Sequence, residues 1–320
     1  MTLIKKNNFL IALIKSLRPT QWIKNMALYT PLVFSGFFFY DPVDAPSYFY
    51  TVTIAFVLFS ILTSSLYIIN DIADVKADQK HPIKKKRPIA AGELPIPLAL
   101  FSAIVGIFLV FFFSLSFTPF FRALIILYVA LQLVYSFKIK HVPILDVMSI
   151  AAGFIIRVYA GAMIVDLHMS VWFLLTVISA SLFLAVGKRQ SEKTLMSKQL
   201  NQTRKTLSKY SERLLDIYTG MFANATWLTY ALYAFQTSTS NAAPATERFP
   251  QIYIILPRTL QSQKLLMVTI PLVIFGVMRY LALIYEENVG ESPDKVLLND
   301  KTLLTTVFSL ILLIMAIIYL

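Results

Sequence analysis

Long apolar segments recur along the whole chain, and they set the strongest limit on what it can fold into. A helix needs about 20 mainly apolar residues to cross the hydrocarbon core of a bilayer. Nine segments meet that need: residues 22–40, 48–69, 95–117, 120–137, 143–165, 170–187, 214–236, 264–285 and 302–320. These runs are continuously apolar, whereas the strands of a membrane barrel alternate between apolar and polar residues. The sequence therefore predicts an all-α polytopic membrane protein, with residues 1–320 forming a single integral membrane domain.

The composition agrees with this class and excludes several kinds of chemistry. Hydrophobic residues make up 57% of the 320 residues and charged residues only 14%, against about 25% charged in soluble domains. The chain has no cysteine, so disulfides, thiolate nucleophiles and cysteine metal sites are excluded.

The distribution of lysine and arginine predicts the orientation of the chain in the membrane. With the N-terminus in the cytoplasm, twenty-four of the 29 basic residues fall on the cytoplasmic side and four on the other, while Arg157 lies within a span. Cytoplasmic loops are enriched in Lys and Arg. We therefore expect a multi-pass protein of the cell's inner (plasma) membrane, with the N-terminus and active site cytoplasmic and the C-terminus outside. The net charge of +12 then favours anionic lipids and substrates over nucleic acid.

One strongly charged stretch, residues 68–92, separates two of the apolar segments. It opens with Asn70, Asp71, Asp74 and Asp78, whose spacing would place the three carboxylates on one face of a helix. Such carboxylates repel one another unless a cation lies among them, and Mg²⁺ with substrate phosphates meets that need. The alternative is a solvated helix end whose acids pair with neighbouring lysines. We predict a Mg²⁺ site at Asp71, Asp74 and Asp78.

A basic run follows the acids, and prolines break the helix on both sides of it. The segment 81–88 reads HPIKKKRP, and Pro82 and Pro88 cannot continue a helix. We expect the basic run to fold back beside the acids. The metal would then hold a diphosphate while His81, Lys84 and Arg87 contact the rest of the substrate.

These motifs resemble the UbiA superfamily of intramembrane prenyltransferases. The N-D-x-x-D-x-x-x-D pattern follows the second of nine predicted spans, and RPTQWIKN at 18–25 is similar to the superfamily's opening signature. The resemblance implies nine transmembrane helices in a bundle around a central cavity that opens to the cytoplasmic side. It also implies that the acids grip a diphosphate through Mg²⁺.

The chain departs from the superfamily after the sixth predicted span, where a second aspartate-rich motif is usual. The segment at 187–192 reads GKRQSE, so Lys188, Arg189 and Glu192 stand in that place. The sequence is similar here to the decaprenyl-phosphate phosphoribosyltransferase branch. HPIKKKRPIAAG at 81–92, YSFKIKHVPILD at 135–146, GFIIRVYAG at 153–161 and RYLALIYEENVGESPDKVLLND at 279–300 carry the same resemblance. That branch implies 5-phosphoribosyl 1-diphosphate and a polyprenyl phosphate as substrates.

We expect Lys188 and Arg189 to begin a loop after the sixth span and to bind substrate phosphate, with Glu192 orienting them. Arg157 is expected to line the central cavity, either binding phosphate or pairing with a buried acid, because a charge inside a span is costly. The catalytic candidates are Asp71, Asp74, Asp78, Lys188, Arg189 and Glu192. The substrate-binding candidates are Gln21, Lys24, Asn70, His81, Lys84, Arg87, Tyr135, Lys138 and Arg157.

The expected reaction is transfer of the phosphoribosyl group to the polyprenyl phosphate with release of diphosphate and inversion at C1. No general base is required, because a phosphate monoester is already ionised at neutral pH. Two alternatives stay open: prenyl transfer from a prenyl diphosphate to an aromatic acceptor, and transport of a polyprenyl-linked sugar without catalysis. Membrane lipid is an expected partner, nucleic acid is not, and a homo-oligomer is left open.

Overall fold

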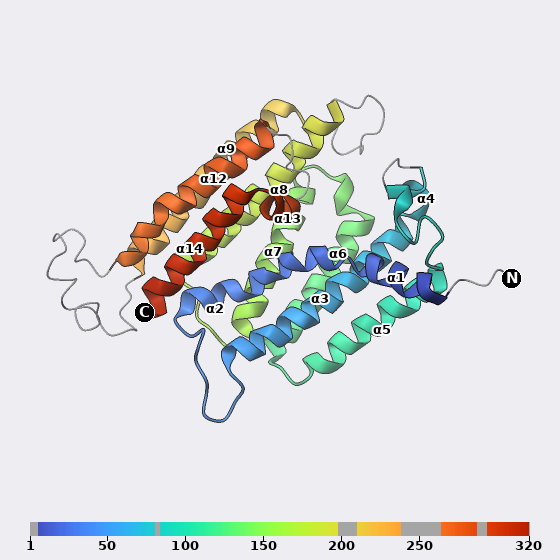
Figure 1. Ribbon diagram of the computed structural model, residues 1–320, viewed down its shortest axis with the longest axis horizontal. Coiled ribbons are helices and arrows are strands. Elements are labelled where there is room, and N and C mark those ends of the chain that lie inside the picture. The colour runs from blue at the N-terminus through green and yellow to red at the C-terminus, as the bar shows by residue number, and fades with distance from the viewer. Residues whose placement is uncertain (1–5, 81–83, 198–209, 238–263, 287–292, 320) are drawn as a thin grey trace.

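The computed structural model describes residues 6–80, 84–197, 210–237, 264–286 and 293–319, which form helices and turns without a strand (Figure 1). The α-helices are α1 (Lys6–Leu17), α2 (Thr30–Ser35), α3 (Tyr48–Ala73), α4 (Val75–Asp78), α5 (Ile96–Ser114), α6 (Pro119–Phe137), α7 (Leu145–Met163), α8 (Val171–Ser197), α9 (Glu212–Gln236), α12 (Ile270–Tyr285), α13 (Pro293–Asn299) and α14 (Lys301–Tyr319). The 3-10 helices are η1 (Pro19–Tyr29), η2 (Lys84–Lys86), η3 (Ile139–His141) and η5 (Leu265–Thr269).

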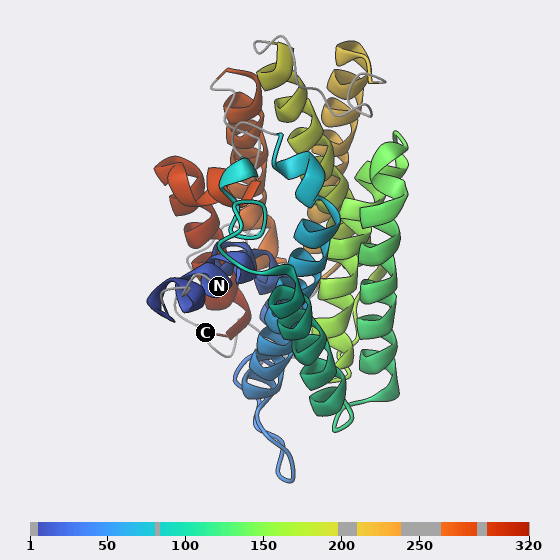
Figure 2. The same ribbon diagram turned by 90° about the vertical axis from the view of Figure 1, so that its right-hand side faces the viewer.

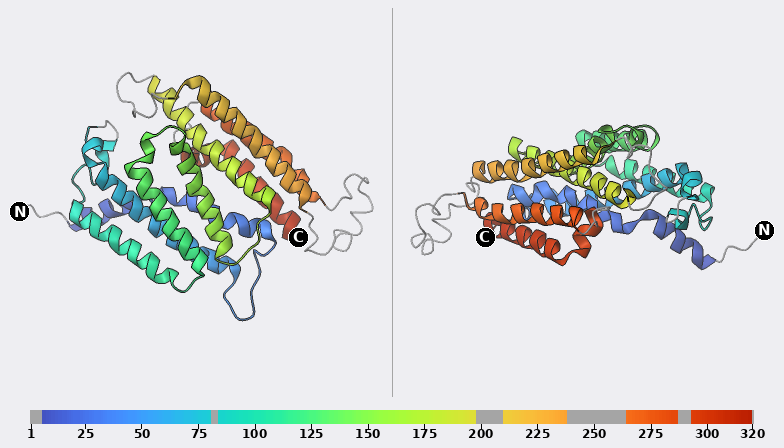
Figure 3. Two further views of the ribbon diagram at one scale, coloured as in Figure 1. Left: turned by 180° about the vertical axis from the view of Figure 1, so that it is seen from behind. Right: turned by 90° about the horizontal axis from the view of Figure 1, so that it is seen from above.

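The long helices lie side by side as a bundle (Figures 1 and 2). Neighbours along the chain pack together, as α6 does on α7, α7 on α8 and α8 on α9. The segment formed by η1 and α2 packs on α3 and α7, and it also contacts α13 and α14 (Figure 3). This segment therefore joins the first half of the chain to the last.

Small residues allow close helix contacts, as expected where lipid removes much of the hydrophobic driving force between helices. The face of α5 that is buried in the bundle carries Ala99, Ala103 and Gly106. A Cβ at Gly106 would lie 2.2 Å from the Ser65 hydroxyl of α3. Between the helices, a core cluster includes Leu28 of η1, Phe59 of α3 and Tyr128 of α6.

Seven helical segments of the described chain are long and apolar enough to cross a membrane: Tyr48–Ala73, Ile96–Ser114, Pro119–Phe137, Leu145–Met163, Val171–Lys193, Leu265–Tyr285 and Lys301–Tyr319. They coincide with seven of the nine predicted spans. Among them, α3 and α7 are the most buried, and both lie beside η1.

The other two predicted spans, 22–40 and 214–236, are built differently. The first is a 3-10 helix followed by the six-residue α2, which ends before Gly36. The second is the continuous helix α9, whose interior holds Thr219, Asn224 and Thr226. Both segments are helical and part of the bundle, but neither is among the seven apolar helices, so nine spans stay a prediction.

Candidate active site

Asp71 lies in the last turn of α3 and faces two arginines. Its side chain is 3% exposed, and Nη2 of Arg18 lies 2.5 and 2.6 Å from its two carboxylate oxygens. Nη1 of Arg87 donates to the same carboxylate at 3.0 Å. The two cations offset the cost of burying this charge.

Arg87 also joins Asp71 to Asp78. Its Nη1 donates to Oδ2 of Asp78 at 2.6 Å, and that carboxylate is buried as well. One cationic nitrogen therefore lies between two buried carboxylates. The prediction that the basic run folds back beside the acids is confirmed for Arg87.

Asp74 is held apart from the other two acids. The helix α3 ends at Ala73, Asp74 caps it, and α4 is a single turn, so the expected strip on one continuous helix is wrong. Aspartate competes for backbone hydrogen bonds and favours helix ends. Its carboxylate accepts from Lys140 Nζ at 2.8 Å and from Asn70 Nδ2 at 3.3 Å, and its side chain is 28% exposed.

The acids fit a divalent cation through their chemistry and partly through their placement. In the part of the chain that the structure describes, no three acidic or histidine side chains gather closely enough to hold one metal ion. Two carboxylates, those of Asp71 and Asp78, converge on one positive nitrogen. Magnesium takes one or two carboxylates and completes its shell with waters and substrate phosphates, so the residues present suit it.

Arg18 and Lys140 are site residues that sequence reasoning missed. Arg18 has a left-handed backbone, with φ 52° and ψ 61°, a conformation that costs a non-glycine residue about 1–3 kcal/mol and often marks functional sites. A signal was available, because Arg18 opens the RPTQWIKN segment. Lys140 lies in the quoted segment 135–146, but its contact with Asp74 was not predictable, because the two residues are 66 apart in the chain.

Arg189 forms the centre of a second polar cluster, inside the bundle. Its side chain is 1% exposed, and Nε lies 2.7 Å from Oδ2 of Asp146. Nη1 donates to Glu192 at 2.5 Å, and Nη2 donates to the Tyr135 hydroxyl at 3.0 Å. The predicted pairing of Arg189 with Glu192 is confirmed. Both terminal nitrogens of the guanidinium donate to protein groups, and Nε makes an ion pair with Asp146 without an aligned hydrogen bond.

Lys188 is the more accessible cation of the pair. Its side chain is 30% exposed, and Nζ lies 4.0 Å from Glu192. Both residues are part of α8, which runs to Ser197. The prediction that they begin a loop is wrong, because residues 188–196 are mostly strong helix formers that carry the helix past the apolar span.

Asp146 ties this cluster to the segment before α9. The Tyr210 hydroxyl donates to Oδ1 of Asp146 at 2.7 Å and accepts from the Ile144 backbone N–H at 2.5 Å. Burial, reinforced by the hydrogen bond to Asp146, raises the pKa of the Tyr210 hydroxyl above its ordinary value. Tyr210 thus stays a neutral donor. Sequence reasoning gave Asp146 no role, because Arg189 lies 43 residues further along the chain.

Arg157 contacts neutral groups rather than an acid. It is 4% exposed, and it donates to Asn25 Oδ1 at 2.7 Å, to the Gly153 carbonyl at 2.8 Å and to the Tyr128 hydroxyl at 2.6 Å. Its guanidinium also lies over the Tyr128 and Phe154 rings. None of the described carboxylates pairs with it, so the expected pairing with a buried acid is not found.

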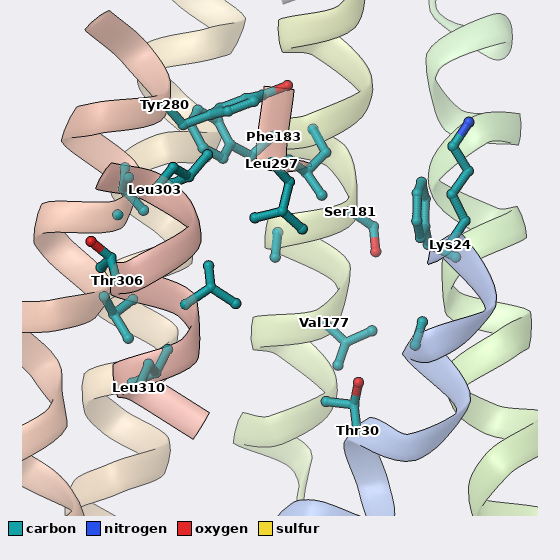
Figure 4. Close-up of a pocket in the computed structure, with 18 of the residues that line it drawn as sticks. Lys24, Thr30, Val177, Ser181, Phe183, Tyr280, Leu297, Leu303, Thr306 and Leu310 are labelled. Atoms are coloured by element: carbon teal, nitrogen blue, oxygen red, sulfur yellow. The ribbon is translucent and has the colours of Figure 1, made fainter. Parts of the chain in front are cut away.

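An apolar pocket of about 470 Å³ opens between η1, α8, α12 and α14. Figure 4 shows Lys24 on one wall, with its amino nitrogen pointing toward the Tyr280 end and away from Thr30 and Leu310. Nζ of Lys24 donates to the Gln21 side chain at 2.5 Å. One end of a mainly apolar pocket therefore carries the Lys24 ammonium group, which is held by the Gln21 carboxamide.

Of the remaining predicted residues, the structure describes Tyr135, Lys138 and Lys84. Tyr135 belongs to the Arg189 cluster. Lys138 is exposed where α6 ends, and Lys84 begins η2. His81 lies outside the described residues.

Comparison with known families gives one match over most of the chain. The model of the UbiA prenyltransferase family matches residues 28–288. A decaprenyl-phosphate phosphoribosyltransferase of Mycolicibacterium smegmatis is 34% identical over 302 residues, which are 92% of this chain and 89% of that protein. The enzyme of the same name from Corynebacterium glutamicum is 35% identical over 92% of this chain and 83% of its own length.

Solved structures show the same fold. A UbiA homologue from Archaeoglobus fulgidus, bound to GPP and Mg²⁺, superposes with a TM-score of 0.65 at 16% identity. The match covers 96% of this chain and 99% of that one. At this identity the likeness concerns the helical architecture alone.

Proposed function

This chain belongs to the UbiA prenyltransferase family, and on that premise we propose that it transfers the 5-phosphoribosyl group of 5-phosphoribosyl 1-diphosphate to a polyprenyl phosphate. Its similarity to two decaprenyl-phosphate phosphoribosyltransferases over 92% of its length supports this activity. The observation that carries the proposal is one continuous segment, 18–30, which contacts the acid cluster through Arg18 and lines the apolar pocket through Lys24.

The donor's diphosphate binds at the acid cluster. Asp71 and Asp78, which meet at Arg87, would hold Mg²⁺ together with Asp74, which has to leave Lys140 to join them. When bound, the ion supplies positive charge against the diphosphate as it leaves. Arg18 and Arg87 already lie on these acids. As the donor enters, they turn to its phosphate oxygens, which arginine recognises through paired hydrogen bonds.

The acceptor's lipid tail occupies the apolar pocket, and its phosphate lies at the Lys24 end. The lining is mainly aliphatic and aromatic, which suits an isoprenoid chain. Lys24, whose amino group donates to the Gln21 carboxamide oxygen, supplies a cation at the head of the pocket. The phosphate head and the apolar tail of the acceptor thus lie at different positions along the segment 18–30.

The transfer itself is a single displacement. An oxygen of the acceptor phosphate forms a bond to C1 of the ribose as the bond from C1 to the diphosphate oxygen breaks, which inverts C1. No side chain has to remove a proton, because the acceptor phosphate is already an anion at neutral pH. The residues act by positioning the two substrates and stabilising charge.

The second cluster divides into an accessible cation and a positioning core. Lys188 is exposed enough to contact the donor's 5-phosphate. Arg189 is enclosed by Asp146, Glu192 and Tyr135, so it fixes the end of α8 instead of touching substrate. In this assignment Glu192 orients Lys188. The site and the N-terminus face the cytoplasm.

A prenyl transferase acting on an aromatic acceptor would also use an apolar pocket beside acids. The structural relative bound to GPP and Mg²⁺ makes this the second candidate. The two activities differ in which bond breaks: the ribosyl C1–O bond or the prenyl C–O bond.

The test uses purified protein with 5-phosphoribosyl 1-diphosphate labelled in the ribose and, separately, in the 5-phosphate. We expect both labels to enter a lipid-soluble product when a polyprenyl phosphate is present, and chelation of divalent cations to stop the reaction until Mg²⁺ is restored. Consumption of a prenyl diphosphate with an aromatic acceptor, and no labelled lipid, would contradict the proposal.

A further inference from the structure

The helix η1 has an unusual form that orders its side chains. It holds 3-10 geometry for eleven residues, Pro19–Tyr29, although runs longer than three or four residues are uncommon. With three residues per turn, side chains three apart stand in straight rows. In an α-helix the same spacing would turn by about 60° at each step.

One row faces the two substrates of the proposed reaction. Lys24, Ala27 and Thr30 all line the apolar pocket at this spacing. Gln21 precedes them in the row and contacts Lys24. Arg18, which lies just before η1 and has a left-handed backbone, contacts Asp71. The segment 18–30 thus runs from the acid cluster to the pocket.

A second row fixes η1 to its neighbours. The Trp22 indole donates to the Ser64 hydroxyl of α3 at 2.9 Å. Asn25, which is fully buried, donates to Ser60 and Thr63 on the same helix at 3.1 and 3.3 Å. Both anchors of this row bind α3.

The carboxamide oxygen of Asn25 links this row to α7, because it accepts from Nε of Arg157 at 2.7 Å. Arg157 is held in turn by the Gly153 carbonyl and the Tyr128 hydroxyl. One turn beyond, a Cβ at Gly161 would lie 1.9 Å from the Leu28 carbonyl oxygen, so the two backbones touch there. The contact of α7 with η1 is thus both polar and steric.

We propose that Arg157 is a positioning residue that holds η1 in its 3-10 register through Asn25 and so aligns Lys24 with the acceptor phosphate. The proposal rests on the proposed function, because it assigns the row's purpose to that reaction. Each nitrogen of the Arg157 guanidinium already donates within the bundle, and the group is 4% exposed. It is therefore not a phosphate ligand.

The kinetic test compares variants on both sides of this hydrogen bond. Arg157→Gln and Asn25→Ala are each expected to raise KM for the polyprenyl phosphate and lower kcat/KM by about 10- to 100-fold, the scale of a small misplacement. The KM for 5-phosphoribosyl 1-diphosphate should change less, because the acids are on α3 and α4. The loss in the double variant should be smaller than the product of the two single losses, because both changes remove the shared Arg157–Asn25 hydrogen bond.

Asn25→Asp separates positioning from phosphate binding. It keeps an acceptor oxygen for Arg157 while neutralising the arginine's charge, but it removes the amide donor to Ser60 and Thr63. The KM for the polyprenyl phosphate should therefore rise less than in Arg157→Gln. A loss as large as that of Arg157→Gln would overturn the proposal. Arg122→Gln, the same change near the start of α6, is the matched control and should leave both KM values unchanged.

A second measurement is independent of activity. The native chain has no cysteine, so spin labels can be placed at Met26→Cys on η1 and Ile104→Cys on α5, both exposed. Arg157→Gln should shift the distance between the labels, and Asn25→Asp, which keeps the acceptor for Arg157, should shift it less. An unchanged distance in Arg157→Gln overturns the positioning role. If wild-type protein fails to transfer phosphoribose but the distance shifts, the proposed function fails while the structural role stands.

Discussion

At the scale of single residues, the three acids after α3 divide into two environments. Asp71 and Asp78 are buried and share Arg87, whereas Asp74 is partly exposed and pairs with Lys140. Removing a buried acid would leave arginines unpaired and disturb the fold. Asp74 is consequently the acid whose loss reports most cleanly on binding and catalysis.

We predict that Asp74→Asn lowers turnover at least about 100-fold, because a group that stabilises the departing diphosphate is weakened. The melting temperature should stay close to that of the wild type. Asp166→Asn is the matched control, since Asp166 is exposed and its backbone, with φ 52°, accepts asparagine readily. Equal activity in Asp74→Asn and wild type would refute the metal assignment.

Lys188 and Arg189 are adjacent, and we predict opposite phenotypes for them. Arg189→Gln leaves the buried Asp146 carboxylate without its cation and removes the nearer of the two cations from Glu192, which should cost about 3–5 kcal/mol of unfolding free energy. Lys188→Gln should cost less than about 1 kcal/mol and instead raise KM for 5-phosphoribosyl 1-diphosphate. Unfolding curves in detergent and steady-state kinetics give the two readouts. A stable Arg189→Gln protein would show that the cluster does not brace α8.

At the scale of elements, the packing of η1 against α7 tolerates no added atom at one point. Gly161→Ala would place a Cβ 1.9 Å from the Leu28 carbonyl oxygen, so we predict displacement of η1 with loss of both activity and thermal stability. Gly220→Ala on α9 meets nothing within 4 Å and should be neutral or stabilise by up to about 1 kcal/mol. Equal tolerance of the two changes would contradict this packing.

Asp300, just before α14, makes the stability of the folded protein depend on pH in the acidic range. Nη2 of Arg279 on α12 lies 2.6 Å from the Asp300 carboxylate, and this hydrogen bond holds the Asp300 pKa below its ordinary value of 3.8. The contribution is present above that value and is lost as the pH falls through the lower, folded-state pKa. Between pH 5 and strongly acidic pH, the melting temperature of Asp300→Asn should therefore fall less than that of the wild type. An equal fall in both proteins would contradict a stabilising role for this ion pair.

The sequence could predict most elements and only part of the site. Apolar runs fix seven helices because length and composition alone decide them. Arg87 was predicted beside the acids because prolines force the chain to turn there. The 3-10 form of η1 was not predictable, since its contacts include Arg157 and Gly161, more than 130 residues away in the chain. The same holds for the contact of Arg189 with Asp146.

At the scale of the whole molecule, the resemblance to the UbiA superfamily is confirmed, while orientation remains a prediction. Single cysteines can be introduced at Glu93, before α5, and at Asp44, between α2 and α3, because both positions are exposed. In intact cells a membrane-impermeant thiol reagent should label Asp44→Cys and leave Glu93→Cys unlabelled. The reverse pattern would place the site outside.

The central claim is that the acids after α3 bind the donor's diphosphate through a divalent cation. Its most direct test is magnetic resonance of protein loaded with Mn²⁺ in place of Mg²⁺ and with 5-phosphoribosyl 1-diphosphate. We predict ³¹P couplings to the bound ion in wild-type protein, and their loss in Asp74→Asn but not in Asp166→Asn. Couplings that survive in Asp74→Asn, or a bound donor without any coupling, would contradict the account.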